Sequence, residues 1–92
     1  MGWGRTPTAD LRVLIDGARR VPFTDQIRLD AQTLSRCSHD LAAMAAGEPS
    51  LVPAARALAE LLAGARPVPL TAEVRVERLA IEAVWQTAAA AG

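Results

Sequence analysis

The stretch ARRVPFTDQIRLD, residues 18–30, recurs 47 residues later as ARPVPLTAEVRVE, residues 65–77. Over the longer windows 11–34 and 58–81, nine of 24 positions are identical. Gly, Arg, Val-Pro and Thr recur in the same order, which chance matching of Ala and Leu in a biased composition does not explain. The sequence therefore predicts two tandem copies of one structural unit.

A helix is expected at the start of each copy. Thr8 and Ser50 are natural N-caps for these helices. Each helix should stop at a Val-Pro pair, because proline disfavours helical geometry in the residue before it. The apolar residues at helical spacing are Leu11, Leu14, Ile15 and Ala18 in the first copy, and Leu51, Leu58, Leu61, Leu62 and Ala65 in the second.

A short strand should follow each Val-Pro pair. Residues 26–30 and 73–77 alternate polar and apolar side chains, which favours β structure. Arg28 and Arg75 occupy matching positions on the polar face. Because a lone strand leaves backbone groups unpaired, we expect the two strands to form a small two-stranded antiparallel ribbon about a pseudo-twofold axis.

A second helix should close each copy. Asp30 can cap a helix that ends at Gly47, and the last helix should begin near Glu77. The predicted fold is mainly α, with four helices in two tandem helix-strand-helix repeats and the small ribbon. The single domain spans 1–92, with a flexible tail at 1–7 that carries Trp3, repeat one at 8–46, a linker at 47–50 and repeat two at 51–92.

The stretch from Ala18 to Asp30 resembles the short N-terminal module of actinobacterial DivIVA-like proteins of the septum and growing pole. In that module a helix, a turn of the form AR-x-VP-x-T and a second amphipathic helix precede a long coiled coil. Residues 65–77 resemble it too, but no heptad coiled coil follows here. The resemblance implies an interaction or self-assembly module of an actinobacterium and offers no catalytic residues.

Composition narrows the classes of function. The 92-residue chain balances ten Arg, with no Lys, against ten Asp and Glu. A net charge of zero does not favour a protein whose main task is to hold phosphate backbones. Hydrophobic residues make up 51%, which excludes whole-chain disorder, and aromatics only 3%, so the core must be aliphatic.

The sequence also bears on location. Cys37 is the only cysteine, so no intramolecular disulfide can form, as is usual in a reducing compartment. No apolar run approaches the ~18–20 residues that span a bilayer, and the N-terminus lacks the apolar region of a secretory signal. These features predict a cytoplasmic protein.

No catalytic, cofactor or metal site is predicted. Cys37 and His39 lie two positions apart on a helix and cannot share a face, so the first is expected to be a buried small hydrophobe and the second a solvated residue. A metal site needs three or four ligands. The remaining carboxylates are spaced for intrahelical ion pairs: Arg12–Asp16, Asp16–Arg20 and Arg78–Glu82.

The predicted function is therefore non-enzymatic protein–protein interaction or self-assembly. The protein would be a small regulatory or scaffolding factor whose partner is a second copy of itself or another cytoplasmic protein. The candidate interface residues lie on the first and last helices and at the two helix ends: Leu11, Leu14, Ile15, Arg19, Arg66, Ile81 and Trp85.

The alternative is a DNA-binding transcriptional regulator of the ribbon-helix-helix kind. Such proteins place strand side chains in the major groove. Arg28 and Arg75 would make those contacts. Nucleic acid is the less favoured partner, because the residues that flank the two arginines are amides or acids that do not attract phosphates: Gln26, Asp30, Glu73 and Glu77.

Overall fold

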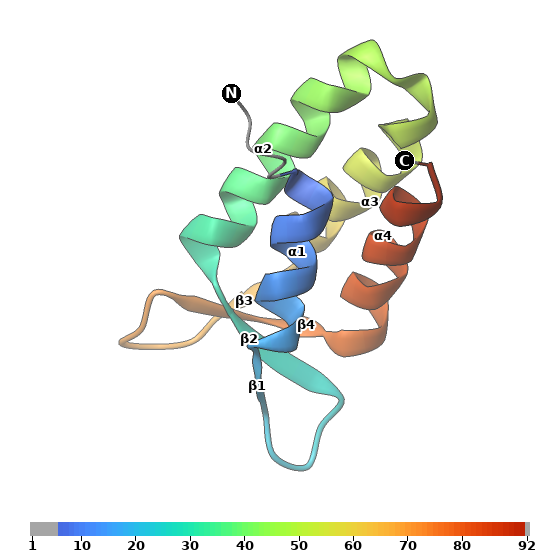
Figure 1. The fold of residues 1–92 in the computed structure, drawn as a ribbon. Helices are drawn as coiled ribbons and strands as arrows, with labels where there is room; N and C mark the ends of the chain where they lie inside the picture. The colour runs from blue at the N-terminus through green and yellow to red at the C-terminus, as the bar shows by residue number, and fades with distance from the viewer. Residues whose placement is uncertain (1–5, 92) are drawn as a thin grey trace.

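The computed structural model describes residues 6–91 as a layer of helices packed on one side of a small sheet (Figure 1). The elements are α1 Pro7–Asp16, β1 Arg19–Arg20, β2 Gln26–Asp30, α2 Ala31–Gly47, the 3₁₀ turn η1 Pro49–Leu51, α3 Val52–Ala63, β3 Arg66–Pro67, β4 Glu73–Glu77 and α4 Arg78–Ala91. No helix in this part of the chain is long and apolar enough to cross a membrane.

The centre of the sheet is the predicted ribbon. Strands β2 and β4 pair antiparallel, with Arg28 directly opposite Arg75. These two residues are equivalent in the 47-residue repeat, so a pseudo-twofold axis passes between them. The expected antiparallel pairing of residues 26–30 with 73–77 is confirmed.

The sheet is wider than predicted, because its strand order is β1-β2-β4-β3. The helices do not run to the Val-Pro pairs as expected: α1 ends at Asp16 and α3 at Ala63, and a two-residue strand follows each. Each Val-Pro pair instead forms the corner of a hairpin that joins this strand to the next one. The Val21 N–H donates to the Gln26 carbonyl at 2.9 Å, and the Val68 N–H donates to that of Glu73 at the same distance. The fold therefore combines four helices with a four-stranded antiparallel sheet and is not purely α-helical.

Two predicted helix caps are wrong. α1 begins at Pro7, and the hydroxyl of Thr6, not Thr8, accepts the Ala9 N–H at 3.1 Å. Ser50 lies in η1, and α3 begins at Val52 without a side-chain cap. In both copies a proline in the first turn sets the helix start, because its fixed φ suits that position. Of the residues assigned to the linker, Gly47 belongs to α2, and Pro49 and Ser50 belong to η1.

The cap at Asp30 is confirmed. Its carboxylate accepts the Thr33 N–H at 2.8 Å and the Thr33 hydroxyl at 2.8 Å. These hydrogen bonds hold the pKa of the Asp30 carboxyl below its ordinary value, because they stabilise the charged form. Strand β2 thus passes directly into α2, which fixes the orientation of the helix relative to the sheet.

Both copies contribute to one aliphatic core. Five pairs of positions related by the 47-residue repeat are buried in both copies. These pairs are Leu11 and Leu58, Leu29 and Val76, Leu34 and Ile81, Cys37 and Val84, and Leu41 and Ala88. The two copies therefore bury their apolar faces against each other.

Candidate functional site

Each hairpin ends in the same turn. In the first, the Thr24 N–H and hydroxyl both donate to the Val21 carbonyl, at 3.2 and 2.8 Å, and the Thr24 hydroxyl accepts the Gln26 N–H at 3.1 Å. Thr71 makes the same three bonds in the second hairpin, at equal distances. The repeated threonine thus closes the turn in both copies.

The residue between proline and threonine is held in an unusual conformation. Phe23 and Leu70 both have φ of 65°, and among the described residues they are the only non-glycine residues with positive φ. Proline followed by a left-handed residue is the pattern of a type II turn, which favours glycine or asparagine at that place. A side chain there costs about 1–2 kcal/mol. The chain carries this strain twice.

The same two side chains are fully exposed. Phe23 and Leu70 each have 105% relative accessibility, the highest of the large apolar side chains described. Figure 1 shows the two hairpins projecting from the sheet in different directions. An apolar side chain that is both strained and solvated contributes nothing to the core, so its presence points to a contact outside the chain.

A row of four arginines crosses the sheet beside these turns. The strand register places Arg19 opposite Arg28, Arg28 opposite Arg75 and Arg75 opposite Arg66. Side chains opposite one another lie on the same face of a sheet. This face is the one that does not carry the buried residues Ile27 and Leu29. Sequence analysis named these arginines in two separate groups, and the structure brings them together.

An open pocket of about 660 Å³ joins the first turn to this row. It is lined by Phe23 and Gln26 from the first hairpin, Arg66 and Arg75 from the second, and Leu61 of α3. Glu60 and Glu77 also reach it. The pocket therefore offers both apolar and charged side chains to a ligand.

Most of the predicted interface residues are used by the chain itself. Leu11, Ile15 and Ile81 are buried in the core, where a partner does not reach them. Leu14 and Trp85 are half-buried and pack against the core. Arg19 and Arg66 are exposed. Trp3 lies outside the described residues.

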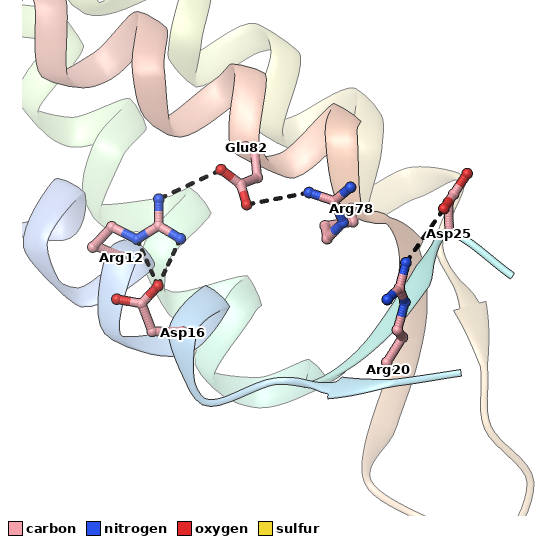
Figure 2. Close-up of polar contacts among 6 residues, drawn as sticks. All are labelled: Arg12, Asp16, Arg20, Asp25, Arg78 and Glu82. Atoms are coloured by element: carbon pink, nitrogen blue, oxygen red, sulfur yellow. Dashed lines mark hydrogen bonds and ion pairs between the residues drawn. The ribbon is translucent and has the colours of Figure 1, made fainter. Parts of the chain in front are cut away.

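Trp85 is further covered by a charged network between α1 and α4. The guanidinium of Arg12 lies 4.8 Å from the centre of the indole ring. It also pairs with Asp16 at 2.7 Å and with Glu82 at 3.6 Å, as Figure 2 shows. Trp85 thus helps to join the two copies.

Two of the three predicted intrahelical ion pairs are present. Arg12 pairs with Asp16, and Arg78 pairs with Glu82 at 3.7 Å. Arg20 instead lies 3.7 Å from Asp25, across its own hairpin (Figure 2). The predicted Asp16–Arg20 pair does not form, because α1 ends at Asp16 and the chain turns into β1.

Cys37 is buried, and its counterpart in the second copy is the apolar Val84. Burial raises the pKa of the Cys37 thiol, with a smaller contribution from the charge of Asp10. His39 is exposed. Within residues 6–91 no group of three or more His, Cys, Asp and Glu side chains is placed to hold a metal ion.

Sequence analysis missed Phe23 and Leu70. The available signal was an apolar residue between proline and threonine in both copies, at a position that turns leave in solvent. Comparisons with family models, curated proteins and solved structures find no match for this chain.

Proposed function

We propose that the chain is a non-enzymatic protein–protein interaction module that binds its partner through the two hairpin turns. The observation that carries this proposal is the strained and fully exposed apolar residue at each turn, Phe23 and Leu70. Apolar side chains on a rigid projection can fill a partner's pocket with little loss of conformational entropy.

The duplication gives the module two such projections on one rigid body. Two weak contacts on one molecule reinforce each other when the partner offers two sites at the matching distance. Self-assembly through the sheet edges is less favoured, because β1 and β3 are only two residues long and β3 contains Pro67. The turns are therefore the surface to test.

The test compares matched variants. Phe23→Gly with Leu70→Gly removes both apolar side chains and leaves the turn conformation favourable. Val13→Ser is the control, because Val13 is 68% exposed on α1, a helix that contains no residue of either turn. Light scattering over a tenfold concentration range shows whether the wild type self-associates, and affinity capture shows whether it retains another protein.

We expect the double glycine variant to lose the complex and the control to keep it. Thermal unfolding of all three proteins checks that each remains folded. A glycine variant that is folded and still binds like the wild type would refute the role of the turns.

DNA binding is the second candidate, and the arginine row is the observation in its favour. Four strands span about 14 Å, three strand spacings, which exceeds the major-groove width of about 12 Å. Asp30, Glu73 and Glu77 lie on the same face of the sheet, where they would oppose phosphates. A mobility shift at low salt, abolished by Arg28→Ala with Arg75→Ala, would support DNA binding, and no shift would exclude it.

A further inference from the structure

We propose that Arg75 and Arg66 form a binding site for a carboxylate of the partner. In the pseudo-symmetric site of the other copy, Arg28 already binds the chain's own Glu73. This inference rests on the proposed function and deepens it by stating the chemistry of the partner. The contact would be an acidic side chain beside an apolar one, so that the first reaches the arginines and the second reaches Phe23.

The two copies differ in the group that faces the central arginine. Arg28 forms an ion pair with Glu73 at 2.7 Å. The 47-residue repeat maps Arg28 onto Arg75 and Glu73 onto Gln26. Arg75 therefore faces an amide where Arg28 faces a carboxylate. The Gln26 amide group donates to Glu77 at 2.9 Å, and its Oε1 atom is buried without a hydrogen-bond partner.

Arg75 consequently lacks the ion pair that Arg28 has. Among residues 6–91, neither Arg75 nor Arg66 forms an ion pair. The Nε atoms of Arg28 and Arg75 are both buried without a hydrogen-bond acceptor, so the two arginines differ in the ion pair alone. Like charges directly opposite each other in a sheet are destabilising. Arg75 lies between Arg28 and Arg66, so an added anion would relieve this repulsion where neither Arg75 nor Arg66 has an ion-paired carboxylate.

The surroundings select a carboxylate over a phosphate. The pocket that holds Arg66 and Arg75 is also lined by Glu60 and Glu77, whose charges would repel a dianion. A single carboxylate can accept from the guanidinium groups at a smaller electrostatic cost. Phe23 and Leu61 line the same pocket and offer an apolar contact beside the charged one.

Two single-residue variants test the site. Gln26→Glu gives Arg75 the internal carboxylate that Arg28 already has. Glu73→Gln removes that carboxylate from Arg28. Each change introduces the residue that the other copy has at the equivalent position. The residue directly opposite is acidic in both cases, since Glu73 lies opposite Asp30 and residue 26 lies opposite Glu77. Thermal unfolding confirms that both variants fold.

The probes are the capped dipeptide acetyl-Phe-Glu-amide, its Gln analogue and inorganic phosphate. Each is titrated at low salt while the arginine Nε–Hε signals are followed by NMR. We expect the Glu dipeptide to shift the signals of Arg75 and Arg66 in the wild type. The Gln analogue, and the Gln26→Glu variant, should bind at least about tenfold more weakly, the effect of losing a charged hydrogen bond.

Glu73→Gln should gain a second site, seen as new shifts at Arg28 and Arg19. Equal binding of the two dipeptides, or a Gln26→Glu variant that binds like the wild type, would overturn the carboxylate site. Tighter binding of phosphate would overturn the choice of carboxylate. Because these titrations need no partner, they can succeed when the turn variants refute the proposed function, and fail when those variants support it.

Discussion

Phe23 and Leu70 are the only non-glycine residues with positive φ among those described, and their side chains lie in solvent. The local hydrogen bonds of Thr24 and Thr71 hold each turn closed, so the strain is imposed by the turn and not by packing. The identity of residue 23 can therefore be changed without disturbing the core.

Replacing Phe23 by Gly and by Ala isolates the backbone strain. Both changes remove the ring, but only Ala keeps a Cβ at positive φ. We expect the Gly variant to be more stable than the Ala variant by about 1 kcal/mol, because glycine adopts this φ without steric cost. Thermal or urea unfolding measures the difference, and an Ala variant of equal or greater stability would contradict the strain.

Asp30 makes the stability of the protein depend on pH at the acid end. Its pKa is lowered on folding by the hydrogen bonds from Thr33, so its contribution is present above the ordinary aspartate pKa of about 3.9 and is lost as the pH falls through the lower folded value. Asp30→Ala should lower the melting temperature at pH 7. The difference from wild type should shrink in strong acid, and a difference independent of pH would refute this linkage.

At the scale of the elements, the two sheet edges differ. Val21 and Gln26 form a hydrogen-bonded pair, so the next residue along, Arg20, directs its backbone N–H away from β2. Its counterpart in β3 is Pro67, which has no N–H to donate. Proline at an outer position of an edge strand prevents pairing with another chain.

Arg20→Pro should therefore be tolerated. It recreates the Arg-Pro-Val-Pro sequence of residues 66–69, and it loses only the ion pair with Asp25, both of whose side chains are 67% exposed. We expect the free energy of unfolding to change by less than about 1 kcal/mol. Arg28→Pro, in the centre of the sheet, is the contrasting variant and should not fold. Unfolding curves for both decide the point.

At the scale of the whole molecule, the copies are halves of one core. Strand β2 pairs with β4, and the buried residues Leu34 and Ile81 come from different copies. A fragment of residues 1–47 should be largely unfolded as a monomer, because half of its apolar neighbours are missing. Mixing it with residues 48–92 should restore helical circular dichroism. A folded monomeric fragment would contradict a shared core.

The sequence predicted the parts of this architecture that repeat. Self-comparison located the antiparallel partner strands, and period-two alternation separated Ile27 and Leu29 from Arg28. The edge strands were missed because two residues carry no periodicity. Their pairing depends on the conformation of the hairpin turn, and the alternation of polar and apolar residues does not indicate that conformation.

Interface residues were harder to predict for a related reason. Leu11, Ile15 and Ile81 have the apolar spacing of a helix face, but that spacing does not say whether the face meets the same chain or another. The structure shows that the chain covers these three itself. Phe23 lies in no periodic segment, so its importance became visible only with its φ angle and exposure.

The pseudo-twofold axis between Arg28 and Arg75 has a genetic consequence. In a dimer of identical subunits every substitution appears at both symmetry-related positions, because one codon specifies both. Here two codons specify them, so Gln26 and Glu73, or Arg20 and Pro67, can be selected separately. A single gene can thus keep the packing of a symmetric dimer while giving its two ends different specificities.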